Sequence, residues 1–361
     1  MNFKIRSARI ALIAAGILLS PATHAGEREE RAVLATAVSG FIEPGYERLL
    51  HESDFTLQAV NALCSQASVT NLRAARTSFG SLVEAWSRIE IVRFGPIVED
   101  NRLERMFFFP DRRGIGLRQV QAILASHDAS ALDADQLAVK SVALQGIGTL
   151  EYLLFGADAD NLAGGDTFRC GFAAAVAQRI DDTAGELTHA WQEPDGIAKH
   201  LSDPGPDHAD FRTTQEGLSA LLGVFINTTE LIIDSRIRPF TGETRADAKP
   251  KLAPYWRSGL TGRSLNAHFE ALEQLLDVSG MAELLPEDAR VAAKSVKFEL
   301  ANARRAVATP KTPLDEAAAN EGQRGALQYL LIVTRSIQRI FTEQLAAGLG
   351  LAAGFSATDG D

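Results

Sequence analysis

Glu151 is the one charged residue in an apolar, glycine-containing stretch of the chain, GIGTLEYLLFG at residues 146–156. An acid among apolar neighbours must be paired, hydrated or protonated when it is buried. Gly148 lies three residues earlier, on the same helix face, and removes side-chain bulk beside the carboxylate at a cost of about 1 kcal/mol relative to alanine. Close helix packing explains Gly146 and Gly148 but not the acid. Glu151 is therefore a candidate functional carboxylate.

Two other segments bring charged side chains into positions where they could cooperate with such an acid. WSRIEIVRFGP carries Glu90 and Arg93 three residues apart, on one face of an expected helix. An ordinary solvent-exposed ion pair is the alternative interpretation of these two residues. YWRSG places Arg257 and Ser258 in a short polar turn.

No complete catalytic or metal-binding pattern is present in the sequence. The seven histidines are scattered, and the only HxxE pair, His24 and Glu27, straddles a predicted cleavage point. A GxSxG elbow, a P-loop and the glycine pattern of a Rossmann fold are all absent. Any chemistry must come from residues that folding brings together.

The N-terminus predicts export. Lys4, Arg6 and Arg9 precede an apolar run that is too short to span a bilayer as an anchor, and small residues favour cleavage after Ala25. Cleavage removes three of the 36 basic residues, which leaves 33 against 46 acidic ones and a formal charge of −13. We therefore expect a periplasmic protein that is not integral to the membrane, is repelled by nucleic acid and has cationic, metallic or protein partners.

Cys64 and Cys170 are the only two cysteines. In an oxidising compartment such a pair tends to close, so a disulfide is the favoured interpretation and two buried thiols the alternative. Neither a CxxC spacing nor a Cys/His cluster of a zinc site is present.

Apolar residues recur at intervals of three and four almost throughout, which predicts an all-α protein built from antiparallel four-helix-type bundles. Ser68 can cap one long helix that Gly95 stops, Asp133 with Gln136 can cap another, and Pro44 should kink or divide the first. The expected helices cover residues 29–50, 54–66, 68–94, 115–126, 133–156, 167–192, 211–236, 264–278, 287–308 and 321–347.

The mature chain of about 336 residues is long enough for two domains. Residues 193–210 are rich in proline and polar residues, as linkers are. The predicted organisation is a signal peptide at 1–25, an N-terminal bundle at 26–195, a linker at 196–210 and a C-terminal bundle at 211–361.

A short internal similarity supports two related bundles. GTLEYLLF in the first half recurs as GALQYLLI in the second, with Gln328 at the position of Glu151. Eight residues can match by chance, but one copy in each half is what a duplicated bundle would give.

Several segments, taken together and in order, resemble the imelysin-like family over nearly the whole mature chain. They are LC at 63–64, WSRIEIVRFGP at 86–96, FFFPDRRG at 107–114, QGIGTLEYLLFG at 145–156, FRCGF at 168–172, YWRSG at 255–259 and GFSATDGD at 354–361. The resemblance implies an exported all-α protein of two related bundles with a functional site near their interface. Members are classed with the M75 peptidases and associated with bacterial iron uptake.

The resemblance also implies a GxHxxE signature, in which a histidine and a glutamate one turn apart share a metal. Gly146 and Glu151 match its ends, but Gly148 stands where the family has histidine. A zinc-type site would need three protein ligands from elsewhere. Glu151 and Glu90 are left as candidate ligands for a harder cation, a divalent metal or iron, which accepts oxygen donors.

Three functions remain open. The first is a non-catalytic accessory protein of iron acquisition that binds a small ligand or a protein partner in a cleft between the bundles. The second is an M75-type metallopeptidase with Glu151 as general base. The third is an interaction module that presents a bundle surface to a membrane receptor. For the first, the residues expected to line the cleft are Glu151, Tyr152, Glu90, Arg93, Arg257 and Ser258.

Overall fold

The computed structural model describes residues 21–351. The predicted signal peptide lies outside these residues except for its last five, and the terminal GFSATDGD lies outside them entirely. Within residues 21–351 the secondary structure is helical and contains no strand, so the predicted all-α class is confirmed.

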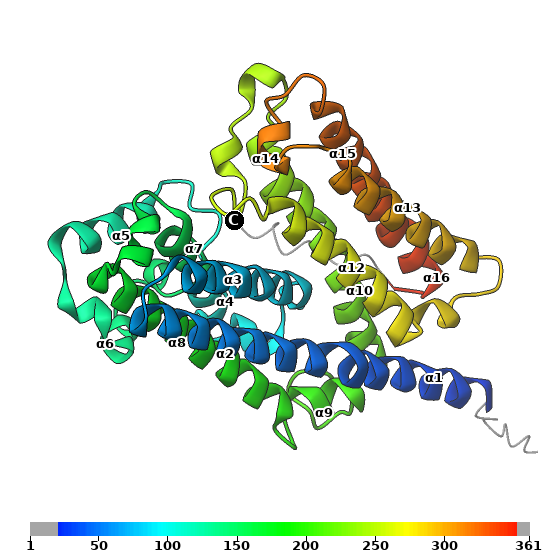
Figure 1. The fold of residues 1–361 in the computed structure, drawn as a ribbon. Helices are drawn as coiled ribbons and strands as arrows, with labels where there is room; N and C mark the ends of the chain where they lie inside the picture. The colour runs from blue at the N-terminus through cyan, green and yellow to red at the C-terminus, as the bar shows by residue number, and fades with distance from the viewer. Residues whose placement is uncertain (1–20, 352–361) are drawn as a thin grey trace, which may run out of the picture.

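The chain begins with one long helix that serves both halves of the molecule (Figure 1). Helix α1 (Pro21–Ala37) continues through a π-helical turn (Val38–Ile42) into α2 (Glu43–Ser65). The predicted break between residues 50 and 54 is wrong. The interruption expected at Pro44 is the π-helical turn directly before it, where the regular ladder cannot continue because proline lacks an amide donor.

Helix α2 packs against α3 (Val69–Ile89) and α8 (Thr167–Gln192) to form the core of the N-terminal half. The Ser68 hydroxyl accepts a hydrogen bond from the Asn71 amide and so caps α3, as predicted. A disulfide joins Cys64, at the end of α2, to Cys170, at the start of α8, which confirms the predicted pairing. The ends of the two helices are thereby fixed side by side.

The prediction of a single helix over residues 133–156 is wrong. In the structure this segment forms three short pieces. They are α6 (Ala134–Ala138), a 3₁₀ turn (Val142–Leu144) and α7 (Ile147–Phe155). Asp133 caps α6 at the Gln136 amide as expected. Glu151 therefore lies in a nine-residue helix.

The C-terminal half is a set of packed helices on the upper right of Figure 1. Its long members are α10 (Thr214–Glu230), α12 (Thr261–Ser279), α13 (Arg290–Ala308) and α15 (Arg324–Arg339). Helix α13 packs on both α12 and α15, while α15 also contacts α10. The N-terminal α1 packs against α10 and α12, so it belongs to this half in space although it comes first in the chain.

Short helices and turns complete the fold. They are α4 (Arg102–Met106), α5 (Ile115–Ser126), α9 (Ile197–Ser202), α11 (Arg238–Thr241), α14 (Leu314–Ala317) and α16 (Ala346–Gly348). Helices α5 and α8 have the limits that the sequence predicts. Helix α9 lies inside the predicted linker. The division into two bundles with these boundaries, and their duplication, stay predictions.

The two halves share one continuous core of buried apolar side chains, and α3 of the first half packs directly against α12 of the second. Among residues 21–351, one helical stretch, Thr214–Thr241, is long and apolar enough to cross a membrane by length and composition. In its most apolar window 61% of the residues are buried inside the fold, as is typical of a core helix.

Candidate functional site

A cavity of about 360 Å³ opens where α5 and α7 of the N-terminal half face the loop that leads into α12. We call it the cleft. Three of its aromatic rings come from the FFFP segment after α4, one from α7 and two from the YWRSG turn. They are Phe107, Phe108, Phe109, Tyr152, Tyr255 and Trp256.

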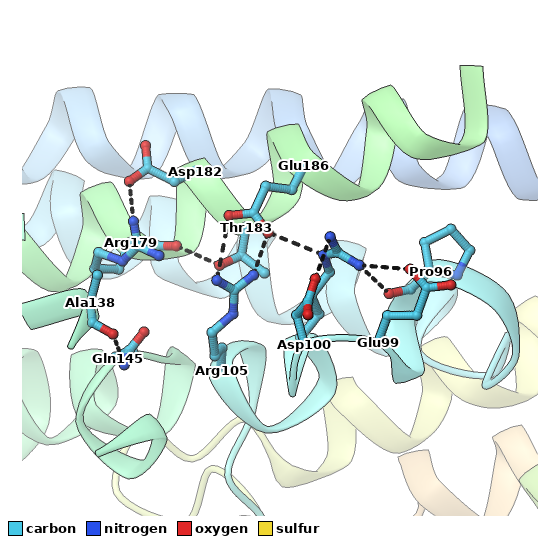
Figure 2. A network of polar contacts seen from close by, with 11 residues as sticks. Pro96, Glu99, Asp100, Arg105, Ala138, Gln145, Arg179, Asp182, Thr183 and Glu186 are labelled. Atoms are coloured by element: carbon cyan, nitrogen blue, oxygen red, sulfur yellow. Dashed lines mark hydrogen bonds and ion pairs between the residues drawn. The ribbon is translucent and has the colours of Figure 1, made fainter. Parts of the chain in front are cut away.

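An ionic network joins α4, directly before the FFFP segment, to α8 (Figure 2). The guanidinium groups of Arg102 and Arg105 both pair with Glu186 of α8. Close to them, the Gln145 side chain donates to the Ala138 carbonyl at 3.1 Å. These contacts fix the two segments that meet at Gly146, directly before the helix that carries the candidate acid.

Gly146 is required by the close approach of those segments. A Cβ atom at this position would lie 2.4 Å from the carbonyl oxygens of both Arg105 and Met106, which are backbone atoms with little freedom to move. At Gly148 a Cβ atom would meet only Cε2 of Phe107, at 3.8 Å. The first glycine therefore permits a backbone contact, whereas the second leaves space beside Glu151.

We expect Gly146→Ala to lower the free energy of unfolding by about 1–3 kcal/mol, because the added methyl group forces the α4 segment away. Gly148→Ala is the matched control and is expected to stabilise the protein by about 0.4–1 kcal/mol, since alanine restricts the unfolded chain. Urea unfolding of both variants measures the contrast. Equal stabilities would show that the contact at Gly146 is not tight.

Glu151 is buried, with 4% of its surface exposed, and its partners come from the YWRSG turn. One carboxylate oxygen, Oε1, accepts hydrogen bonds from the Ser258 amide at 3.0 Å and the Ser258 hydroxyl at 2.8 Å. The other, Oε2, lies 3.9 Å from Nη1 of Arg257. Burial raises the pKa of the Glu151 carboxyl and outweighs both the Ser258 hydrogen bonds and the charge of Arg257, which lower it.

This direction of the shift predicts a pH dependence. A group whose pKa is raised on folding contributes stability that is complete below its ordinary pKa of 4.5 and is lost as the pH rises through the folded value. Glu151→Gln removes that loss, so the stability of the variant relative to the wild type should increase from pH 4 to pH 8. Urea unfolding at both pH values measures it; a relative stability that falls with pH would mean that the ionised carboxylate is the favoured form.

Arg257 is a cation held in place by rings. Its guanidinium carbon lies 4.4 Å from the Trp256 ring centre and 5.3 Å from that of Tyr152. Within the described part of the chain its side chain donates no hydrogen bond, and its one ion pair is the 3.9 Å contact with Glu151. The N–H groups on the cleft side are therefore free to bind an acceptor.

Glu90 does not line the cleft, contrary to the prediction. It is 2% exposed, and both of its oxygens accept hydrogen bonds at 3.0 Å from Nη2 of Arg236, while Nε2 of His268 contacts Oε1. Burial by itself raises the pKa of Glu90, but the charges of Arg236 and His268 and the hydrogen bond from His268 outweigh it and hold that pKa at about 2.

Arg93 also lies elsewhere. Helix α3 ends at Ile89, so Arg93 is beyond the helix and the shared face predicted for it with Glu90 does not form. Its side chain lines a separate cavity with Phe94 and Asn227. The alternative of an exposed pair is wrong as well, since Glu90 is buried with other partners.

An aromatic stack lies next to the buried Glu90 cluster and also faces the cleft. The Phe107 ring stacks on Tyr255, with centres 4.8 Å apart, and on Phe109, with centres 5.3 Å apart. The Arg236 guanidinium lies over Phe107 and Phe109 at 5.2 and 4.8 Å. The cluster and the cleft are thus adjacent but distinct.

The donor set does not fit a metal centre. Glu151 and Glu90 are bound to different partners, and among residues 21–351 no group of three or more His, Cys, Asp or Glu side chains is placed to hold an ion. Of the residues expected to converge, the structure brings together Gly146, Gly148, Glu151, Tyr152 and Arg257 along the cleft, with Ser258 bonded to the acid.

Sequence reasoning missed Arg236, His268 and the aromatic lining of the cleft. The run of three phenylalanines before Pro110 was a usable signal, since consecutive large rings cannot all face one core. No local pattern marks Arg236 or His268, because each sits in an ordinary helical sequence.

The fold and the cleft together define a class: an all-helical protein with a charged, aromatic-lined pocket where its two halves meet. The chain belongs to the imelysin family. The family model, described as Imelysin (Peptidase M75), matches residues 42–339.

Solved structures share the fold. An imelysin-like protein from Psychrobacter arcticum 273-4 is similar with a TM-score of 0.78 and 21% identity, over 91% of this chain and 98% of that one. A precursor named as an iron-regulated protein A, from Parabacteroides distasonis ATCC 8503, gives a TM-score of 0.74 and 14% identity, over 89% and 95% of the two chains. No curated protein matches.

Proposed function

We propose that this protein is an exported, non-catalytic binding or accessory protein linked to bacterial iron acquisition, which binds its ligand in the cleft. The observation that carries the proposal is the arrangement of Arg257, whose guanidinium group lies over the rings of Tyr152 and Trp256, beside the buried carboxyl group of Glu151. A concave, largely apolar pocket with a few fixed polar groups is the usual form of a small-molecule site.

Binding is favoured over peptide hydrolysis by the side chains available. A metallopeptidase needs three protein ligands and an open position for water on the metal. Glu151, the expected general base, has Ser258 and Arg257 as neighbours and, within residues 21–351, no cluster of metal-ligating side chains beside it.

Export and the link to iron have separate support. The basic and apolar N-terminal segment is typical of a signal peptide, which would deliver the chain to the periplasm. The similar structure from Parabacteroides distasonis is named as an iron-regulated protein.

The test is growth under iron limitation of the source organism with the gene deleted. We expect the wild-type gene and Arg113→Gln to restore growth, because Arg113 is exposed and does not line the cleft. Arg257→Gln should fail to restore it although the folded protein is present at the wild-type level. Full rescue by Arg257→Gln, together with loss of rescue by substitutions on the outer helices, would instead support a surface interaction module.

A further inference from the structure

We propose that the cleft binds a planar aromatic molecule that carries a carboxylate or a similar anionic group, and not a bare metal ion. This inference rests on the proposed function, because it takes the cleft as the binding site, and it adds the chemical class of the ligand.

The rings of the cleft favour a flat, apolar ligand body. Phe107 and Tyr255 are already stacked in parallel, and Trp256 is half-buried with Arg257 on one of its faces. Aromatic rings prefer offset-stacked or edge-to-face neighbours, and an aromatic ligand supplies such a neighbour to the rings that line the cleft. A volume of about 360 Å³ is that of a small organic molecule and far exceeds the need of a single ion.

The lining of the cleft has more cations than acids, and two of these cations have no ion pair among residues 21–351. Three cations line the cleft, Arg112, Lys251 and Arg257, and within residues 21–351 neither Arg112 nor Lys251 forms an ion pair. The Lys251 ammonium lies 5.5 Å from the Trp256 ring centre. Guanidinium groups bind carboxylates and phosphates in a planar fork, so these side chains select an anionic group on the ligand.

The two acids that line the cleft are already engaged. The Asp111 carboxylate accepts hydrogen bonds from the amides of Ile115 and Gly116, at 2.7 and 2.9 Å, and so caps the start of α5. Glu151 accepts hydrogen bonds from both donors of Ser258 at Oε1, and its Oε2 faces Nη1 of Arg257 at 3.9 Å. Neither acid therefore has an open carboxylate that could bind a cationic ligand. The arginines, in contrast, have N–H groups that can bind an anionic ligand.

Gly148 gives the ligand room to approach α7. Outside its own helix, a Cβ atom there would have one neighbour within 4 Å among residues 21–351, the edge of Phe107. The face of α7 that carries the acid is consequently open to the cleft, and a ring can lie across Gly148 with its anionic group toward Arg257.

The experiment is a titration of the purified mature protein, followed by calorimetry. The probe is 2-naphthoate, compared with 2-naphthylmethylammonium, cyclohexanecarboxylate, and ferrous, ferric and zinc salts alone. We expect 2-naphthoate to bind at least about tenfold more tightly than either organic comparison. The ammonium probe loses the hydrogen bond to the charged guanidinium group, and cyclohexanecarboxylate loses the aromatic stacking and part of the apolar area. The metal salts should give no binding that depends on the cleft residues.

Variants assign the binding to the cleft. Arg257→Gln should weaken 2-naphthoate binding about tenfold or more, and Arg113→Gln should leave it unchanged. If Arg257→Gln lowers thermal stability, Lys251→Gln provides the same readout from an exposed side chain, with the nearby Lys249→Gln as its control.

Tighter binding of the ammonium probe, binding of a metal salt that Arg257→Gln abolishes, or no binding of any aromatic anion would each overturn the inference. The growth test separates the two proposals. If Arg257→Gln fails to restore growth and no aromatic anion binds, the cleft is the site but the ligand class is wrong. If 2-naphthoate binds and Arg257→Gln grows normally, the ligand class holds and the link to iron acquisition fails.

Discussion

Replacing Glu90 with glutamine is expected to cost about 3–5 kcal/mol of the free energy of unfolding at pH 7, because it leaves Arg236 as an unpaired buried charge. Arg236 is 3% exposed, and its Nε and Nη1 atoms are buried without a hydrogen-bond partner in the described part of the chain. Among residues 21–351, the Glu90 carboxylate is thus its only anionic partner. Urea unfolding of the variant and the wild type measures the loss.

The cost should depend on pH in a defined direction. The pKa of Glu90 falls from its ordinary value of 4.5 to about 2 on folding, so its contribution is complete above pH 4.5 and is lost as the pH falls through 2. The stability difference between wild type and Glu90→Gln should therefore shrink from pH 7 to pH 2. Comparing the two proteins at each pH cancels the titration of the other carboxylates.

A double variant distinguishes the buried charge from simple loss of packing. Glu90→Gln with Arg236→Met removes both charges, and we expect it to be more stable than Glu90→Gln alone, since an apolar side chain of similar length replaces an unpaired cation. Asp195→Asn breaks the exposed pair of Asp195 with Lys199 and should leave stability near the wild-type value. A Glu90→Gln variant as stable as wild type at pH 7 would refute the electrostatic role of the cluster.

Removing the disulfide by substituting serine for Cys64 and Cys170 is expected to lower the free energy of unfolding by about 2–5 kcal/mol. The bond closes a loop between residues 106 positions apart, so it restricts the unfolded chain strongly. It also joins the ends of α2 and α8, which pack against each other in the core of the N-terminal half.

The measurement is urea unfolding with and without a reductant. The wild type should lose stability when it is reduced. The stability of the double serine variant should not change with the reductant. A wild type that is equally stable in both conditions would show that the packing of α2 on α8 already fixes these ends.

Much of the fold follows from local signals. The limits of α5 and α8, and the capping of α3 by Ser68, are predicted correctly because a helix face and its cap are encoded within a few residues. The helix predicted at 133–156 fails for a non-local reason. Gly146 lies against the backbone of Arg105 and Met106, a segment forty residues earlier, and its extended conformation places the start of α7 after it.

The candidate site divides in the same way. The sequence by itself determined that Glu151 is an anomalous acid near a glycine and that the chain is helical, since both depend on residue type and nearby spacing. It favoured a disulfide, because two cysteines in an exported chain tend to pair, and the structure decided against two separate thiols. Only the tertiary structure decided which charges meet. Glu90 binds Arg236 and His268, 146 and 178 residues away, instead of lining the cleft. The partner of a buried charge is set by how distant helices pack, and helical periodicity in the sequence does not predict that packing.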